Sequence, residues 1–258
     1  RTGRREMSAS RRCGADQLIG VIGCSRGVGL RCVVYLVKNN LPCRAICRDT
    51  QAAEQAIRAA IPSIQDLSSR IKFVRADVTD PATLAPAVRG CAGVIFAASA
   101  SVGWRLPFSE HKDTPPHVDY EGAVSAATAA ASEAVPRFVL VSSLAVTRPS
   151  HLLHVLRNSM AGRIMDWKLL GEQGVAQVYK TVSATRRGDM SAIIIRPGSL
   201  TDDPPHGPGG ILVDTDDTLS GTISRSDVAA LCVESVFCDD VRGMTFECVN
   251  GQQVRTSP

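Results

Sequence analysis

The sequence lacks the features that define several broad functional classes. No segment approaches the ~20 consecutive apolar residues of a membrane-spanning helix, so we predict no transmembrane segment. The net charge is only +4, which is too small to indicate a nucleic-acid partner. Repeats, low-complexity tracts and interdomain linkers do not occur either. The 258 residues, 44% of them hydrophobic, suit one α/β domain or one domain with a small lobe.

Disulfide and metal-binding patterns are also missing. The nine cysteines are odd in number and form no C-x-x-C pair. Most lie in expected strands or helices, where a thiol acts as a small apolar group. We therefore expect a reducing compartment, no disulfide framework and no metal site. Cys24 is the exception because it lies in a glycine-rich turn before a helix, where a thiol pKa is lowered. Redox sensitivity is one interpretation of Cys24, and packing of the turn is the favoured one.

Much of the positive charge is concentrated at the N-terminus. Residues 1–16 contain five arginines, at positions 1, 4, 5, 11 and 12, together with serines and few acids. We expect this segment to be either a solvated basic tail or the remnant of an organelle transit peptide, which has the same composition. The first residue is Arg rather than Met, which fits a processed or truncated product. We expect the fold to begin near Gln17 and to form a single domain over residues 17–258.

The rest of the chain is organised around Leu18–Arg31, LIGVIGCSRGVGLR. A short apolar run ends at Gly23, two further glycines follow at Gly27 and Gly29, and a helix-like apolar stripe comes next. This order predicts a strand, a glycine-rich turn and a helix. Glycine lets the backbone approach phosphates closely, and the first N–H groups of the helix point at the anion. The stretch therefore predicts dinucleotide binding, although its G-x-x-x-G-x-G spacing differs from the commoner G-x-G-x-x-G.

Strand and helix patterns then alternate to the end of the chain. Further strands are expected at 43–47, 71–75, 93–97, 137–141, 191–195 and 244–249, with helical segments between them. This alternation predicts an α/β fold, a Rossmann-type doubly wound parallel sheet with a small C-terminal lobe on the substrate side. Residues 211–223 are expected to form a small hairpin. Trp104 and Phe108 lie in an expected loop over the ligand-binding edge of the sheet, where they would line a pocket or anchor the loop.

Two arginines bear on the choice of cofactor. Arg48 follows the second strand, where dinucleotide folds meet the adenosine ribose, and Arg26 lies in the glycine turn. A base at this point accommodates the 2′-phosphate of NADP, so the pair favours NADP over NAD. Asp49 weakens this preference because an acid there binds the free ribose hydroxyls of NAD. The alternative is that both arginines are exposed and have no role.

Eight short motifs in this order resemble a known family. They are G23-C-S-R-G-V-G29, Arg48-Asp49, D77-V-T-D80, V118-D-Y-E-G122, F138-V-L-V-S-S-L144, W167-K-L-L-G-E172, I194-I-R-P-G-S-L-T-D202 and I223-S-R-S-D-V-A229. Over about Gln17 to Asn250 the chain resembles the atypical short-chain dehydrogenase/reductases of the NAD(P)H-binding branch. That branch includes plastid and cyanobacterial proteins tied to photosystem assembly and to the chloroplast translocon.

The resemblance implies roles for individual residues. The pyrophosphate would be held by Gly23, Ser25, Arg26, Gly27 and Gly29. Arg48 would meet the 2′-phosphate, and Asp77 and Val78 would flank the adenine. Ala97, Ala98 and Ser99 would line the nicotinamide ribose, and Pro197 would lie beside the nicotinamide. Ser142 matches the catalytic serine of the family, and Lys168 matches the lysine of its Y-x-x-x-K motif.

The chain departs from the family at the catalytic tyrosine. Ile164 stands four residues before Lys168, where a working dehydrogenase carries the tyrosine that acts as general acid and base. Isoleucine cannot transfer a proton. Tyr179 has no lysine four residues later, and His151 and His154 are alternative donors, although a lone helix histidine is more often a packing residue.

The sequence therefore leaves three alternative functions. The first is an NADP(H)-binding protein without strong catalysis, an accessory or assembly subunit with protein partners in an organellar complex. A plastid is favoured, at the stroma or the thylakoid surface and peripheral to the membrane, over a mitochondrion or the cytoplasm. The second is an NADPH-dependent reductase of a quinone, flavin or enone, because hydride transfer needs position more than acid catalysis. The third is a structural subunit that kept only the fold.

Overall fold

A computed structural model of the chain describes residues 17–64, 66–101, 113–185 and 189–251. The predictions for the basic segment 1–16, and for Trp104 and Phe108, lie outside these residues. Within them, no helix is both long enough and apolar enough to cross a bilayer.

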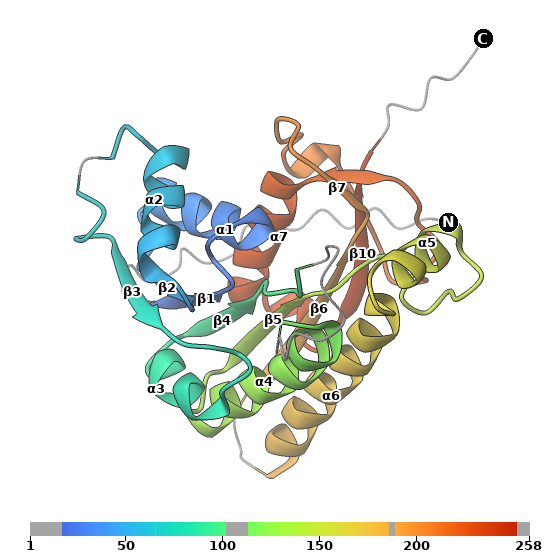
Figure 1. Ribbon diagram of the computed structural model, residues 1–258, viewed down its shortest axis with the longest axis horizontal. Coiled ribbons are helices and arrows are strands. Elements are labelled where there is room, and N and C mark those ends of the chain that lie inside the picture. The colour runs from blue at the N-terminus through green and yellow to red at the C-terminus, as the bar shows by residue number, and fades with distance from the viewer. Residues whose placement is uncertain (1–16, 65, 102–112, 186–188, 252–258) are drawn as a thin grey trace, which may run out of the picture.

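A central twisted sheet organises the described part of the chain (Figure 1), with eight strands in the order β3-β2-β1-β4-β5-β6-β10-β8. The strands are β1 Ile19–Ile22, β2 Cys43–Cys47, β3 Ile71–Arg75, β4 Gly93–Phe96, β5 Arg137–Val141, β6 Ser191–Pro197, β8 Ile211–Asp214 and β10 Thr245–Asn250. All neighbours pair in parallel except β8 and β10. The strand order reverses between β1 and β4, as in a doubly wound sheet, which confirms the predicted Rossmann-type fold.

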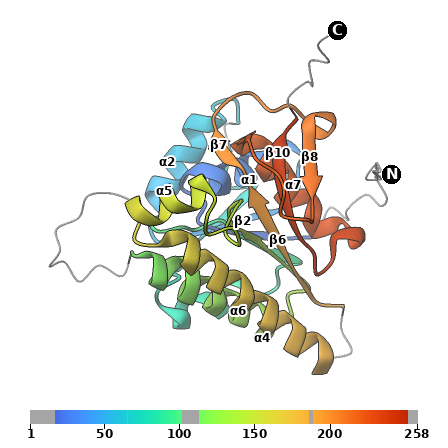
Figure 2. The same cartoon turned by 90° about the vertical axis from the view of Figure 1, so that its right-hand side faces the viewer.

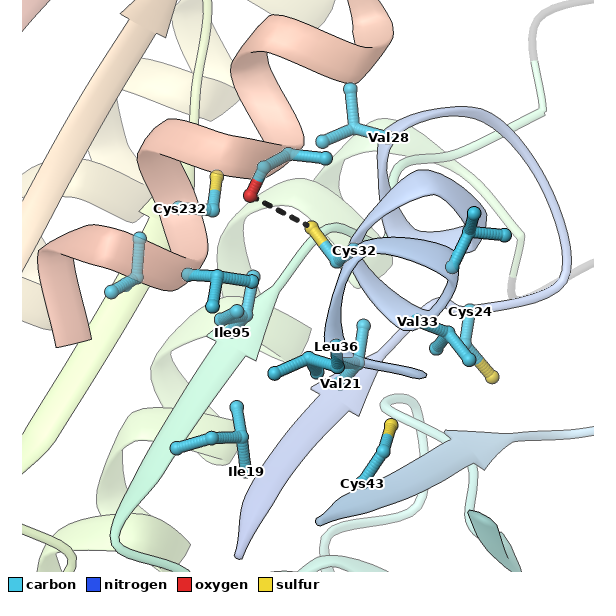
Figure 3. Close-up of a cluster of buried hydrophobic side chains, with 14 of the residues drawn as sticks. Ile19, Val21, Cys24, Val28, Cys32, Val33, Leu36, Cys43, Ile95 and Cys232 are labelled. Atoms are coloured by element: carbon cyan, nitrogen blue, oxygen red, sulfur yellow. Dashed lines mark hydrogen bonds between the residues drawn. The ribbon is translucent and has the colours of Figure 1, made fainter. Parts of the chain in front are cut away.

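Helices cover both faces of the sheet (Figures 1 and 2). One face carries α1 Gly27–Lys38, α2 Thr50–Ala60 and α7 Arg225–Phe237, and the other carries α3 Leu84–Val88, α4 Ala123–Ser132 and α6 Ile164–Thr185. Cysteines act as small apolar groups in the first layer: Figure 3 shows Cys32 on α1 directed at α7, where its thiol lies 4.0 Å from the Ala229 carbonyl oxygen. Because both faces are covered, the central strands are buried throughout.

Polar caps explain where several helices begin. The Asp49 carboxylate accepts a hydrogen bond from Ala52 N at 2.9 Å and starts α2, and Ser224 starts α7. Asp80 caps the short 3₁₀ helix Pro81–Thr83 that leads into α3. A wide helical turn, Pro116–Gly122, leads into α4. Further 3₁₀ turns lie at Pro208–Gly210 and Asp239–Val241.

The helical segment expected between the strands at 137–141 and 191–195 is divided into two helices. α5 spans Leu152–Met160 and α6 begins at Ile164. Gly162 and Arg163 separate them, with φ angles of +58° and +60° that a continuous right-handed helix cannot contain.

The prediction of a small hairpin at residues 211–223 is wrong. Its first half is β8, which pairs antiparallel with β10. Its second half is β9 Thr222–Ser224, which pairs in parallel with β7 Ser199–Thr201 in a separate small sheet. The reason is that β10 would otherwise be an edge strand with unpaired backbone groups, and β8 covers that edge. These two pairings build the small C-terminal lobe.

Candidate cofactor and active site

The glycine turn is tightly packed against the end of β4. Gly23 has a φ of +85°, and a Cβ there would lie 2.6 Å from Ala98 N. A Cβ on Gly29 would lie 2.2 Å from the carbonyl oxygen of Gly23. Gly27 has a φ of +58° and open space beside it. Between them, Ser25 is half-buried and Arg26 is exposed. The glycine-rich turn therefore requires glycine at 23 and 29 on steric grounds. The first helical turn of α1 contains no acidic residue and no side chain caps it, so its first N–H groups are available to an anion.

The other predicted site residues lie at the carboxyl ends of the parallel strands. Ala97, Ala98 and Ser99 follow β4, Ser142 follows β5, and Pro197 ends β6. Backbone hydrogen bonds hold these ends together: Ala97 N donates to Ile22 O at 2.9 Å, and Ser142 N donates to Ile195 O at 2.8 Å. The sheet thus brings residues from distant parts of the sequence to one edge, where α/β proteins bind their ligands.

A buried carboxylate connects the segment after β4 to Lys168. Asp119 Oδ1 lies 2.7 Å from Lys168 Nζ and also accepts from Ser99 Oγ at 2.7 Å, while Asp119 Oδ2 accepts from Ala100 N at 3.0 Å. The Asp119 side chain is fully buried and that of Lys168 is 11% exposed. The ammonium group is therefore held in one position against the end of β4.

Ser142 shares a small pocket with this ion pair. The pocket is lined by Phe96, Ala98, Asp119, Leu140, Val141, Ser142 and Lys168. Ser142 is buried, and its hydroxyl has no hydrogen-bond partner among the described residues. An orphaned buried hydroxyl is unfavourable unless a ligand pairs with it. The pocket itself is too small to admit a water molecule, and the Ser142 hydroxyl and the Lys168 ammonium group belong to its largely apolar lining.

The tyrosine of the family motif has no replacement in this pocket. Ile164 is buried in a small apolar cluster with Val146 and Met165. The Tyr179 hydroxyl donates to the Val135 carbonyl at 3.1 Å in the core, and burial raises its pKa. Tyr179 is thus a structural residue.

Both candidate histidines have structural partners. The Nδ1 atom of His151 accepts from Leu153 N at 3.2 Å and caps α5. The Nδ1 atom of His154 lies 2.9 Å from the Ala145 carbonyl oxygen, and its Nε2 atom lies 3.2 Å from Asp166. Neither ring nitrogen of the buried His154 is directed at the pocket. Both histidines thus make contacts that position α5 and the start of α6.

The two arginines predicted to favour NADP lie close together at the other end of the turn. Arg26 Nη2 donates to Ser101 Oγ at 2.7 Å, and Arg48 Nη2 donates to Asp113 Oδ2 at 3.3 Å. Ser101 N donates to the second oxygen of Asp113 at 3.1 Å, so the carboxylate connects the two. Asp49 is occupied as the cap of α2. The Arg48 side chain is 55% exposed, so its ion pair is weak and open to exchange with another anion.

The remaining predicted residues are built into turns. The Asp77 carboxylate accepts from the Thr79 backbone N–H at 2.9 Å, and Val78 packs near Gly122. Cys24 is fully buried and lies 3.6 Å from the Ile46 carbonyl oxygen. A hydrogen bond with the Cys47 thiol, together with burial, raises the pKa of Cys24 rather than lowering it. Packing of the turn, not reactivity, therefore explains Cys24. The described residues contain no group of acids, histidines and cysteines suited to a metal ion.

A chain of charges behind the pocket was not predicted. Arg196 pairs with Glu172 at 2.7 Å, and Arg148 pairs with Glu247 at 3.0 Å, while Asp217 lies within 4 Å of both arginines. Glu172 is one helical turn after Lys168, and Arg196 precedes Pro197. Burial and the Asp217 carboxylate raise the pKa of Glu247 to about 7. The chain of charges ties α6, β6 and β10 together around the site.

Asp119 is the main functional candidate that sequence reasoning missed. It lies inside the motif V118-D-Y-E-G122, but nothing in that motif indicates that the carboxylate contacts Lys168. The same holds for Glu172 and Arg196, which lie in the motifs W167-K-L-L-G-E172 and I194-I-R-P-G-S-L-T-D202.

The sheet, the glycine turn and the pocket at the strand ends together define a Rossmann-type dinucleotide-binding protein. The chain belongs to the NAD(P)H-binding family, which matches residues 23–239. An uncharacterized chloroplastic protein of Arabidopsis thaliana is 30% identical over 226 residues, which are 85% of this chain and 72% of the relative. Sanguinarine reductase of Eschscholzia californica is 27% identical over 217 residues, 72% of this chain and 74% of that protein.

Solved structures agree on the fold. The oxidoreductase YlbE from Lactococcus lactis superposes with a TM-score of 0.67 at 22% identity, covering 92% of each chain. At this identity the likeness concerns the fold alone. With the family match, it confirms the resemblance drawn from the eight motifs.

Proposed function

We propose that this protein is an NADPH-dependent reductase that transfers hydride to an electron-poor acceptor of the quinone, flavin or enone class. The observation that carries the proposal is the buried, unpartnered Ser142 hydroxyl beside Lys168, in a pocket at the strand ends. A subunit that kept only the fold has no need to retain an orphaned hydroxyl and a buried ammonium group at this place. The relative named sanguinarine reductase supports a reductase activity.

The residues fit a dinucleotide. The turn Gly23–Gly29 has no room for Cβ atoms where it meets β4, and it presents unpaired N–H groups to a pyrophosphate. We assign Gly23, Ser25, Arg26, Gly27 and Gly29 to the pyrophosphate. Asp77 and Val78 would flank the adenine, and Ala97, Ala98, Ser99 and Pro197 would surround the nicotinamide end. Residues 17–258 would then form one cofactor-binding domain.

Ser142 and Lys168 would act as hydrogen-bond and charge donors to the substrate. They would not assist a tyrosine that transfers a proton. When bound, reduced nicotinamide supplies the hydride. The Ser142 hydroxyl donates a hydrogen bond to an acceptor oxygen that gains negative charge, and Lys168 stabilises that charge electrostatically. Asp119 holds Lys168 in place for this task. An acceptor that delocalises its new negative charge needs no proton in the same step. The absence of tyrosine at position 164 therefore restricts which substrates can be reduced, but it does not abolish hydride transfer.

The test is NADPH oxidation by the purified protein with a panel of quinones, flavins and enones. We expect turnover with at least one class, and Ser142→Ala should lower kcat by about 10²–10³-fold, the range for loss of one donor to a developing negative charge. Ser143→Ala is the matched control, because the neighbouring buried Ser143 hydroxyl already donates to the Leu144 carbonyl. A protein that binds NADPH but oxidises it with none of these acceptors would refute the reductase.

The preference for NADP rests on Arg48, and Arg48→Ala tests it. Loss of one charge-assisted hydrogen bond to the 2′-phosphate, about 1.5–3 kcal/mol, should raise the Kd for NADPH by about tenfold or more. The Kd for NADH should change little, since NADH has no 2′-phosphate. Arg58→Ala is the control, because Arg58 has similar exposure and pairs with Glu54 on α2. Equal weakening of both cofactors in isothermal titration would contradict the assignment.

A second candidate is the accessory subunit of an organellar complex, favoured by the apolar residues that α5 exposes. In that case NADPH binding persists without turnover, and the protein co-purifies with partners from native extract. The chloroplastic Arabidopsis relative supports a plastid location for either function.

A further inference from the structure

One carboxylate of the chain lies at the point assigned to the adenosine end of the cofactor. Asp113 Oδ2 accepts a hydrogen bond from Arg48 Nη2 at 3.3 Å, and Asp113 Oδ1 accepts one from Ser101 N at 3.1 Å. The side chain of Arg48 is 55% exposed, whereas that of Asp113 is 13% exposed. The carboxylate is therefore held against the segment after β4, and its arginine partner is open to solvent.

Asp113 uses the donors that a phosphate would use. A guanidinium group binds carboxylate and phosphate oxygens with the same planar geometry, so the two anions compete for Arg48. Arg26 is close by, because it donates at 2.7 Å to the hydroxyl of Ser101, the residue whose backbone N–H bonds to Asp113. The neighbouring acid Asp49 does not take this place, since its carboxylate accepts from Ala52 N as the cap of α2.

We infer that the Asp113 carboxylate competes with the 2′-phosphate of the cofactor for Arg48 and thereby sets how strongly the chain discriminates NADPH from NADH. The inference rests on the proposed assignment of Arg48 to the 2′-phosphate. A phosphate monoester carries about −1.5 to −2 charges at neutral pH, against −1 for a carboxylate, so it displaces Asp113 from the arginine. Because the ion pair is exposed on the arginine side, breaking it costs little. NADH has no 2′-phosphate and leaves the pair intact.

The two oxygens of Asp113 have separate partners, and this arrangement determines the size of the effect. Arg48 can turn from Oδ2 to a phosphate while Ser101 N stays bonded to Oδ1. The carboxylate then remains beside the bound phosphate and repels it. Repulsion between charges about 4 Å apart in a partly buried place, added to the competition for the arginine, corresponds to about tenfold in Kd. Asp113 is thus a specificity-determining residue that weakens the preference for NADPH.

The test is isothermal titration of Asp113→Asn with four ligands: NADPH, NADH, adenosine 2′,5′-bisphosphate and 5′-AMP. Asparagine removes the charge and keeps an oxygen that can accept from Ser101 N. We expect the Kd for NADPH and for the bisphosphate to fall by about tenfold, and the Kd for NADH and 5′-AMP to stay within about twofold. Asp113→Ser, a second variant without the charge, should give the same gain if the first variant is unstable.

Glu133→Gln is the matched control. The Glu133 side chain is 20% exposed and pairs with the exposed Arg89 at 2.9 Å, so its burial and its partner resemble those of Asp113. Glu133 and Arg89 follow α4 and α3, before the next strands begin, which places them at the opposite edge of the sheet from the glycine turn. This variant loses the same charge and should leave all four Kd values unchanged.

Three outcomes would overturn the inference. They are a Kd for NADPH that is unchanged or higher in both Asp113 variants, an equal gain for NADH, and an equal gain in the Glu133 control. The first would show that Asp113 only holds the segment after β4 in place. All readouts are binding constants, so they separate from the reductase activity: absence of turnover with every acceptor refutes the reductase, whereas a selective gain for the 2′-phosphate ligands supports the role of Asp113 in either case.

Discussion

Gly29→Ala is expected to destabilise the protein by about 3 kcal/mol or more and to abolish NADPH binding. The added methyl group would lie 2.2 Å from the Gly23 carbonyl oxygen and 2.8 Å from its carbon. Both atoms are backbone, so no side chain can rotate away, and overpacking of this kind costs about 1–3 kcal/mol even where neighbours adjust. Relief requires α1 to move from the turn, and that movement removes the N–H groups from the pyrophosphate position.

Urea denaturation and titration with NADPH measure the two effects of this change. Gly209→Ala is the control, because that glycine has a negative φ and no atom within 4 Å of the added carbon. We expect wild-type stability and affinity from it. A Gly29→Ala protein with wild-type NADPH affinity would show that the turn does not hold the cofactor.

Asp119→Asn is expected to have the second largest effect, on stability and on catalysis. Removal of one partner of a buried ion pair costs about 3–5 kcal/mol, since the other charge stays buried without compensation. Lys168, 11% exposed, would be that charge. An amide cannot replace the carboxylate, because its NH₂ group would face one of three donors: Lys168 Nζ, Ser99 Oγ or Ala100 N.

The catalytic consequence follows from the position of Lys168. If Asp119 positions the ammonium group, its loss should lower kcat by about 10²-fold, the effect of a displacement of ~1 Å in a reacting group. The KM for the acceptor should change less than kcat. Asp227→Asn is the control: Asp227 is equally buried, but it bonds His206 N, Gly207 N and Asn250 in the small lobe. That variant should lose stability and keep its affinity for NADPH. Equal kinetic losses in both variants would indicate that Asp119 acts only through stability.

Local patterns were enough for the elements that contain their own signals. The glycine turn and the alternation of strands and helices depend on neighbouring residues, so they could be predicted. The roles of Arg26 and Arg48 could be proposed for the same reason, because both follow strands whose ends meet. The hairpin at 211–223 could not be predicted, since the partner of each half lies elsewhere in the chain.

The glycine-rich stretch, the Rossmann-type fold and the loss of tyrosine at position 164 were determined by the sequence alone. Only the tertiary structure decided that Asp119 holds Lys168, that the Ser142 hydroxyl has no partner, and that His151, His154 and Tyr179 are occupied elsewhere. It also decided that α5 carries its apolar residues outward. The physical reason is that backbone preferences are local, whereas the pairing of a buried charge and the exposure of a side chain depend on residues that only folding brings together.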